Sequence, residues 1–381
     1  MLVLTHEYPP YVHGGTGQYA YALASSLAAR GIKVTVVCGL SHSGSTQIER
    51  HSKNLTIMRT AFRDISPRPF WYQIQNARLI KSLANQSDIV HINSPTGSFL
   101  LKRLVKLKPV VTTIHGSVMD WSRSFLSTPV RYLMRYLTPH DLALYGARAT
   151  TFLTDMFDYK ESSSVIFVAK HVAQSFKKHY GSPNGSTHII YNGIRIRQQP
   201  TSDWEPFRFY HAGRFYLSKG LPLLIDAFRL VSEAVPSSVL NIYGTGPLSA
   251  HISRRIQQLG LSKQICLKGF VSNDLLRRSV PRNSAFVLPS TYEGCPIALL
   301  EAYMCGVPAV LPDLPWAQEF AVNRTTATLA SPFDIHDLSE AMLAAVNLRQ
   351  SSGKIREYAS RFNLSTMIDR TIEVYASLAR R

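Results

Sequence analysis

Short apolar runs alternate with longer amphipathic stretches along the first half of the chain. The apolar runs have the length of β-strands, and the stretches between them have the length of helices. The expected strands are Leu2–Leu4, Val34–Cys38, Ile89–Ile92, Val110–Ile114, Val165–Val168 and His188–Tyr191. An amphipathic helix is expected at Gln18–Arg30 and should end at Gly31. Strands separated by helices indicate parallel βαβ units and an open, doubly wound sheet.

A second series of the same kind follows a stretch rich in turn-forming residues, 196–206, which we interpret as a linker. Its expected strands are Phe207–Ala212, Val239–Tyr243, Ile265–Lys268, Ala285–Leu288 and Val307–Leu311. Its expected helices are Gly220–Val235, Leu248–Leu259, Ile297–Cys305, Ile335–Arg349 and Gly353–Leu378. The pattern therefore predicts an α/β protein with two Rossmann-like domains, 1–195 and 207–362. Such sheets bind ligands beyond the carboxyl ends of their strands, so we expect the two domains to face a shared central cleft.

The composition is that of a globular protein. Hydrophobic residues make up 45% and charged residues 17% of the chain, which excludes disordered and fibrous classes. No window reaches the roughly 18 apolar residues of a transmembrane helix, and the first residues do not resemble a signal peptide. The four cysteines, Cys38, Cys266, Cys295 and Cys305, form no CxxC pair, so we expect free thiols in a reducing, cytoplasmic environment.

The net charge of +18 is concentrated in the first half, where residues 1–199 carry 23 basic and 9 acidic side chains. A field of one sign attracts nucleic acid, anionic lipid or phosphorylated substrates, and composition does not choose among them. Two stretches, Phe99–Lys108 and Arg131–Leu137, mix cations with apolar and aromatic residues. They suit an anionic membrane surface. The alternative is that they are core-packed helices with solvated cationic faces.

The glycine cluster Gly14-Gly15-Thr16-Gly17 lies between the first expected strand and the first expected helix. Glycines let backbone N–H groups approach an anion, and the start of a helix adds partial positive charge. A tight turn alone would also account for the cluster. It is not GxGxxG and lacks the later acidic residue of a dinucleotide site.

Two cations, Arg214 and Lys219, follow the expected strand Phe207–Ala212 and precede a helix. Guanidinium and ammonium groups at the carboxyl end of a strand could hold a diphosphate, although a solvated loop is the commoner setting for such pairs.

The strongest motif places Glu293 in a loop and Glu301 in the apolar helix that follows. A carboxylate in apolar surroundings needs a partner, and sugar or ribose hydroxyls are suitable ones. Residues Ile297 and Ala298 open that helix, so their N–H groups could meet a phosphate. The alternative for either glutamate is a structural salt bridge.

Taken together and in order, these motifs resemble those of the retaining GT-B glycosyltransferases of family 4. The resemblance covers nearly the full chain. It includes Gly14–Gly17, Thr113–Gly116, Ile190–Gly193, Gly213–Gly220, Ile242–Pro247, Lys268–Val271, Leu288–Glu301 and Cys305–Pro308. It implies the GT-B fold, with a C-terminal helix of about residues 363–381 that packs back on the first domain. It also implies a cytoplasmic enzyme of polysaccharide or glycolipid synthesis, peripheral on the inner face of a membrane.

The resemblance also implies residue roles. The residues it makes catalytic are His115, Glu293, Arg214 and Lys219. The donor-binding residues are Gly15, Gly17, Arg214, Lys219, Gly244, Val271, Glu293, Ile297, Ala298 and Glu301. No metal and no cofactor are expected, because the cations supply the positive charge. The expected donor is a UDP-, GDP- or ADP-sugar, and the expected acceptor is a glycan or a lipid-linked molecule.

The sequence departs from the family pattern at Tyr191, Arg195, Cys295-Pro296 and Ala169, which affects the expected donor more than the fold. Three other classes stay open. They are a basic protein that binds nucleic acid or membrane without transferase activity, a binding subunit, and an epimerase or phosphorylase of the same fold. No zinc-ligand spacing or RNA-binding motif supports the nucleic-acid class.

Overall fold

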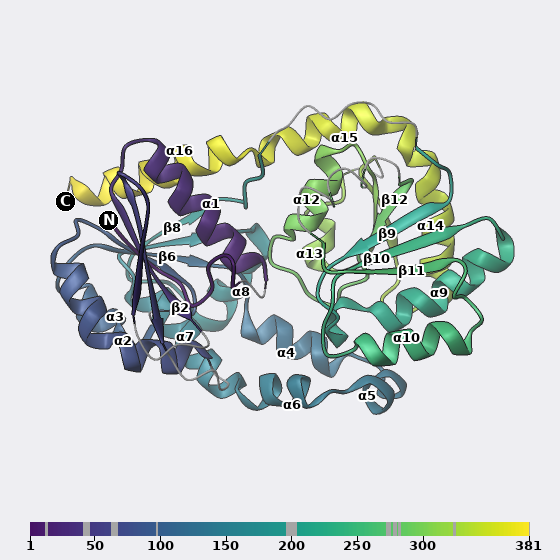
Figure 1. Cartoon of the computed structure of the whole chain (residues 1–381), viewed down its shortest axis with the longest axis horizontal. Coiled ribbons are helices and arrows are strands. Elements are labelled where there is room, and N and C mark those ends of the chain that lie inside the picture. Colours follow the sequence, from purple (N-terminus) through teal and green to yellow (C-terminus); the bar gives the residue numbers. More distant parts are fainter. Residues whose placement is uncertain are drawn as a thin grey trace. The chain divides into compact units, whose positions relative to one another are not determined.

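The computed structural model of the chain describes residues 1–11, 14–40, 46–61, 68–96, 98–195, 204–271, 276, 280, 283–322 and 325–380 (Figure 1). Most of the predicted linker, residues 196–203, therefore lies outside the described residues. The chain divides into two compact units. The first contains residues 1–120, 143–193 and 364–381, and the second contains residues 121–142 and 194–363.

The first unit is built on a mostly parallel sheet in the order β3-β4-β2-β1-β5-β6-β7-β8. Only β3 runs antiparallel to its neighbour among the described strands. The strands are β1 (Leu2–Leu4), β2 (Val34–Leu40), β3 (Gln47–Ser52), β4 (Leu55–Ala61), β5 (Val90–Asn93), β6 (Val110–Ile114), β7 (Ser164–Phe167) and β8 (Ser186–Ile189).

Helices pack on both faces of this sheet. They are α1 (Gly15–Ala29), α2 (Arg68–Asn85), η1 (Ser98–Leu100), α3 (Leu101–Leu104), α7 (Arg148–Glu161), α8 (Lys170–Tyr180) and α16 (Leu364–Ala379). Successive residues of β1 point to opposite faces, as the pleat requires. Val3 belongs to the apolar cluster that contains α1 and α16, whereas Leu2 and Leu4 belong to the cluster with α2 and α3. Figure 1 shows α1 and α16 together on one face.

The second unit contains a parallel sheet in the order β11-β10-β9-β12-β13-β14. Its strands are β9 (Arg208–Ala212), β10 (Val239–Tyr243), β11 (Ile265–Gly269), β12 (Ala285–Val287), β13 (Ala309–Pro312) and β14 (Ala327–Ala330). Its helices are α5 (Val130–Tyr136), η2 (Leu217–Lys219), α9 (Leu221–Ala234), α10 (Ser249–Gln258), α12 (Ile297–Met304), α13 (Pro315–Gln318), α14 (Ile335–Leu348), η4 (Arg349–Ser351), α15 (Ser352–Ala359) and η5 (Ser360–Phe362). Buried aliphatic and aromatic residues of α9, α10 and α14 form one core with the sheet.

All the strands expected from the sequence are confirmed to within three residues at either end. Three strands, β3, β4 and β14, were not predicted. The predicted helix Gly353–Leu378 is wrong as one element, because η5 and extended backbone at Asn363 separate α15 from α16. Phe362, the last residue of η5, is buried at this break.

Residues 121–142 belong to the second unit, although the predicted first domain ran from 1 to 195. Helix α4 (Val118–Leu126) leads out of the first unit, and α6 (Pro139–Gly146) leads back into it. Between them, Tyr132 and Tyr136 of α5 are buried in the core of the second unit, which explains the assignment.

Candidate functional site

In the second unit, Lys219 and Glu293 are directly paired. Lys219 Nζ donates to Glu293 Oε1 at 2.5 Å, and the two side chains are 24% and 11% exposed. They come from loops beyond the carboxyl ends of β9 and β12, which are neighbours in the sheet. The structure therefore brings together two residues that lie 74 positions apart in the sequence.

Backbone contacts fix the loops that carry this pair. Thr291 N–H and Oγ1–H both donate to the carbonyl of Ser218, at 2.9 and 3.3 Å. Gly220 has a φ of +68° and lies so close to Pro289 that a Cβ would sit 2.3 Å from its carbonyl oxygen. Only glycine satisfies both conditions at that position. The two loops are therefore held together on either side of the ion pair.

Two further glycines press the loop after β10 against the loop that carries Arg214. Gly244 has a φ of +124°, and a Cβ there would lie 1.9 Å from the carbonyl oxygen of Gly213. A Cβ at Gly246 would lie 2.7 Å from the backbone nitrogen of Phe215. The close approach of Gly244 to Gly213 therefore shapes the loop that carries Arg214, and the donor-binding role of Gly244 stays a prediction.

Arg214 lies over an aromatic ring. Its Cζ atom is 4.9 Å from the centroid of Tyr216, and the ring of His140 stacks on Tyr216 at 4.7 Å and 8°. His140 begins α6, so the segment 121–142 contributes to the surroundings of the predicted phosphate-binding cation.

Helix α12 begins four residues after Glu293, at Ile297 and Ala298, and its first turn carries no acidic residue. The N–H groups at a helix start favour an anion. Glu301 is half-buried one turn later, and Val271 is half-buried beyond β11. Arg214, Lys219, Gly244, Val271, Glu293 and Glu301 therefore all lie at or near the carboxyl edge of the second sheet.

In the first unit, His115 follows β6 and is oriented by Asn93 at the end of β5. The Nε2–H group of His115 donates to Asn93 Oδ1 at 2.5 Å, because the amide oxygen can only accept. Asn93 Nδ2 in turn donates to the carbonyl of Thr16 at 3.1 Å, in the first turn of α1. One buried amide therefore joins His115 to the turn that contains Gly15 and Gly17.

A chain of buried polar contacts continues from His115 to the C-terminal helix. The ring of Tyr19 meets His115 edge-on at 4.8 Å, and its hydroxyl contacts Thr113 Oγ1 at 3.0 Å. Thr113 contacts His91 Nε2 at 3.1 Å, and His91 Nδ1 contacts the hydroxyl of Tyr375 on α16 at 2.7 Å. Burial lowers the pKa of both His91 and His115 to about 3, so both rings are neutral near pH 7.

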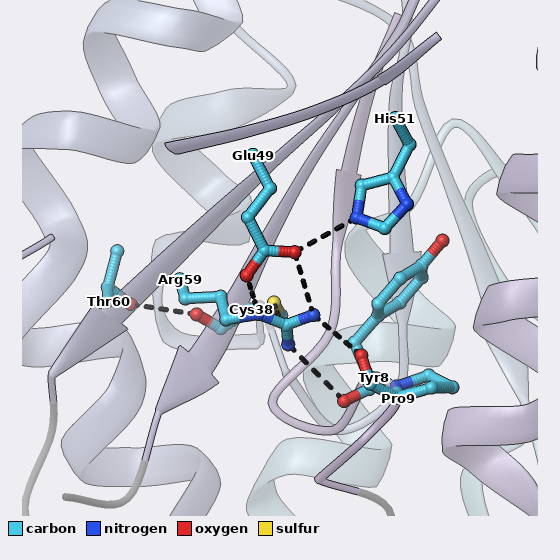
Figure 2. A network of polar contacts seen from close by, with 7 residues as sticks. All are labelled: Tyr8, Pro9, Cys38, Glu49, His51, Arg59 and Thr60. Atoms are coloured by element: carbon cyan, nitrogen blue, oxygen red, sulfur yellow. Dashed lines mark hydrogen bonds and ion pairs between the residues drawn. The ribbon is translucent and has the colours of Figure 1, made fainter. Parts of the chain in front are cut away.

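The loop between β1 and α1 is held by Arg59, which is 3% exposed (Figure 2). Its guanidinium donates to both carboxylate oxygens of Glu49, at 2.5 and 3.2 Å, and to the carbonyl of Pro9 at 2.6 Å. Burial raises the pKa of the nearby Cys38 thiol to about 12, so that thiol is inert. Through Arg59 and Glu49, strands β4 and β3 therefore hold the backbone at Pro9. At Gly14, an added Cβ would meet nothing within 4 Å.

The structure thus groups the predicted site residues within each unit. Sequence reasoning missed Asn93, Tyr19, Tyr216 and His140. Asn93 and Tyr216 carried a usable signal, because one ends a strand beside that of His115 and the other lies between two predicted site cations. His140 carried no such signal, because nothing in the sequence around it indicates that its ring stacks on Tyr216, 76 residues later.

The described residues contain neither a membrane-spanning helix nor a metal-binding cluster. No helix there combines the length and apolar character needed to cross a bilayer. No group of three or more His, Cys, Asp or Glu side chains there could hold a metal ion.

Comparison with known families identifies two matching models that together span most of the chain. Residues 13–198 match Glycosyltransferase Family 4, and residues 194–362 match Glycosyl transferases group 1.

Two relatives are similar along nearly their whole length. The chain is 22% identical to the glycogen synthase of Mycobacterium tuberculosis, with 100% of this chain and 95% of that one covered. It is 25% identical to the O-antigen chain mannosyltransferase C of Escherichia coli, with 97% and 96% covered.

Solved structures share the fold. Sucrose-phosphate synthase from Thermosynechococcus elongatus gives a TM-score of 0.77 at 18% identity, with 99% of this chain and 98% of that one covered. Anabaena HepE in complex with UDP and glucose gives 0.72 at 18% identity, with 99% of both chains covered. The expected GT-B fold is therefore confirmed.

Proposed function

This chain belongs to the GT-B glycosyltransferases of group 1 and family 4, and on that premise we propose that it is a retaining hexosyltransferase. It transfers a hexose-type sugar from a nucleoside diphosphate to a hydroxyl of a glycan or lipid-linked acceptor in cell-surface polysaccharide or glycolipid synthesis. Relatives that act on the O-antigen chain or synthesise glycogen support the polysaccharide assignment. The UDP and glucose bound by Anabaena HepE support the nucleotide-sugar assignment.

The observation that carries the proposal is the Lys219–Glu293 pair at the carboxyl edge of the second sheet. A cation that could neutralise a leaving diphosphate touches a carboxylate that could accept hydrogen bonds from sugar hydroxyls. Arg214 precedes Lys219 on the same loop, and α12 begins just beyond Glu293. These groups supply positive charge and carboxylate oxygens side by side, as a nucleotide sugar requires.

In the proposed reaction, the bond between the sugar C1 and the phosphate oxygen breaks while the acceptor oxygen bonds to C1 from the same face. The leaving phosphate accepts the proton of the acceptor hydroxyl, so charge and atoms balance and the anomeric configuration is kept. Arg214, Lys219 and the first N–H groups of α12 stabilise the charge on the leaving group, and no metal ion takes part. The resemblance assigns neutral His115 to the donor sugar.

A thermal-shift panel tests the donor site. UDP, GDP, ADP and CMP are added without metal to the wild type, to Arg214→Ala and to Arg229→Ala as a control. Arg229 pairs with Glu233 on the exposed side of α9 in the same unit. One nucleotide at about 100 times its Kd should stabilise the wild type by about 2.7 kcal/mol, and only Arg214→Ala should lose this effect. No shift with any nucleotide, together with a shift by RNA, would reject the proposal.

We also propose that the enzyme works at an anionic membrane surface, and the structure separates the two stretches considered for this role. In Phe99–Lys108, the apolar Leu101 and Leu104 are buried in the first unit, so this stretch fits the core-packed alternative. In Arg131–Leu137, helix α5 buries Tyr132 and Tyr136, half-buries Leu133 and leaves Met134 exposed, as are Val130 before it and Leu137 after it.

The exposed face of α5 combines apolar and basic side chains. Met134 is 86% exposed, Val130 67% and Leu137 37%, at helical spacing. Arg131 and Arg135 are exposed beside them. Apolar residues flanked by arginines suit the interface of an anionic bilayer, where each cation contributes about 1 kcal/mol.

Flotation on vesicles tests this docking. Vesicles of phosphatidylcholine with phosphatidylglycerol should carry the wild type, and neutral phosphatidylcholine vesicles should carry much less. Arg131→Gln with Arg135→Gln should weaken binding by about 25-fold, whereas Lys102→Gln with Arg103→Gln on α3 should change it little. Equal flotation on neutral vesicles, or loss only with the α3 variant, would contradict it. Self-association through this face would instead show as a dimer in light scattering that Met134→Ser abolishes.

A further inference from the structure

We propose that Tyr216 is a positioning residue that holds the Arg214 guanidinium at the donor diphosphate, and that His140 holds the ring of Tyr216. This inference rests on the proposed function. Neither residue belongs to the predicted site, and Tyr216 lies between the two cations that do.

The backbone of Tyr216 is tied to both cations. Its N–H donates to the carbonyl of Arg214 at 2.9 Å, and its carbonyl accepts from the N–H of Lys219 at 3.0 Å. The ring is half-buried and lies 4.9 Å from Arg214 Cζ. Tyr216 therefore fixes the backbone between Arg214 and Lys219 and also the direction of the Arg214 side chain.

An aromatic ring can orient an arginine without competing for its ligand. The ring attracts the flat face of the guanidinium, whereas a phosphate is bound by N–H groups at the edge of that plane. A free arginine side chain loses considerable rotamer freedom on binding. Because Tyr216 restricts Arg214 in advance, the diphosphate should bind more tightly than to an unrestrained cation.

His140 is held in place by the start of α6. Thr138 N–H donates to Asp141 Oδ2 at 3.0 Å, and Asp141 N–H donates to Thr138 Oγ1 at 3.2 Å, as in a capping box. Both residues are at most 5% exposed. The ring of His140 lies 4.7 Å from that of Tyr216 and nearly parallel to it. The segment 121–142 thus supports the phosphate-binding loop of the second unit from outside its sequence motif.

A double-mutant cycle tests the inference by calorimetry. Binding of UDP is measured for the wild type, Tyr216→Leu, Tyr216→Phe, Arg214→Ala and the double variant Arg214→Ala/Tyr216→Leu, with uridine as the ligand without phosphates. GDP with guanosine and ADP with adenosine are measured in the same way. We expect Tyr216→Leu to weaken diphosphate binding by about threefold to thirtyfold, to leave nucleoside binding unchanged, and to have no effect once Arg214 is absent. Tyr216→Phe, which keeps the ring, should restore binding.

His140→Ala should show part of the Tyr216→Leu effect, and His140→Phe should restore it. Unfolding temperatures of all variants show that the fold is kept. Equal binding of the diphosphate by Tyr216→Leu and the wild type would overturn the inference while the donor site stands. So would a loss that persists in the Arg214→Ala background or that extends to the nucleoside. If the wild type binds no nucleoside diphosphate at all, the proposed function and this inference both fail.

Discussion

Replacing Glu293 with glutamine should change nucleotide binding and sugar transfer in opposite directions. In the structure the carboxylate of Glu293 holds the Lys219 ammonium at 2.5 Å. In the proposed function, a diphosphate that uses Lys219 must compete with this carboxylate, whereas the donor sugar donates hydrogen bonds to it. Glu293→Gln keeps the shape of the side chain, removes its charge and replaces one acceptor oxygen by an NH2 donor, so it separates the two roles.

The size of both effects follows from the exposure of the pair. The side chains are 24% and 11% exposed, which places the pair between exposed ion pairs, worth up to about 1 kcal/mol, and fully buried ones. Releasing Lys219 should therefore tighten UDP, GDP or ADP binding by about fivefold. Losing hydrogen bonds from sugar hydroxyls to a charged acceptor should lower kcat/KM by about tenfold to a hundredfold.

Calorimetry with the nucleoside diphosphate and initial rates with its sugar conjugate measure the two effects. Glu233→Gln is the matched control, because Glu233 forms an exposed pair with Arg229 on α9. Weaker diphosphate binding by Glu293→Gln would refute the reasoning, since the carboxylate would then support the phosphate site instead of competing for its cation.

Three further predictions concern single residues. Gly244→Ala should destabilise the second unit by about 2–4 kcal/mol in urea unfolding, because its φ is +124° and its Cβ would lie 1.9 Å from a backbone oxygen. The control is Gly260→Ala, at φ +70° with nothing within 4 Å of the added Cβ. It should lower the free energy of unfolding by only about 1 kcal/mol. Arg59→Met should lower the free energy of unfolding by about 2–3 kcal/mol. Hydrogen bonds from Arg59 lower the pKa of Glu49. The difference in stability between wild type and variant should therefore be full above the ordinary carboxyl pKa and shrink as the pH falls below it. His115 should show no titration in NMR spectra between pH 5 and 8, because burial lowers its pKa to about 3. Because the unfolded chain takes up a proton at this histidine more readily, its contribution to the free energy of unfolding should be full above the ordinary histidine pKa of 6.5. That contribution should be lost as the pH falls from 6.5 toward 3.

The sequence predicts an element well where it is buried and bounded by turns. Strands β1, β6 and β10 begin and end at the predicted residues, because each is a short, largely buried run rich in apolar side chains. Strand β3 escapes prediction because it is a polar edge strand, and its pairing depends on β4 and on the part-buried Arg59–Glu49 contact. Such pairing depends on tertiary structure that no local pattern records.

The same limit applies to the site. The motif around Arg214 and Lys219 is local, so its position at a strand end could be read directly. The orientation of Lys219 depends on the distant Glu293. Arg214 contacts the neighbouring Tyr216, whose ring in turn stacks on the distant His140. Amphipathic spacing also could not show that Leu101 and Leu104 of α3 are buried while Val130 and Met134 of α5 are exposed, because exposure depends on what packs against each helix.

The return of α16 to the first unit affects how the protein folds during synthesis. Leu364, Ile368 and Leu378 are part of the core that α1 shares with the first sheet. The ribosome therefore releases the last part of that core only after the whole second unit has been made. Domains usually fold from the N-terminus onward as the chain emerges. Here the second unit can complete its core first, and the core of the first unit must remain incompletely packed until α16 has emerged from the ribosome.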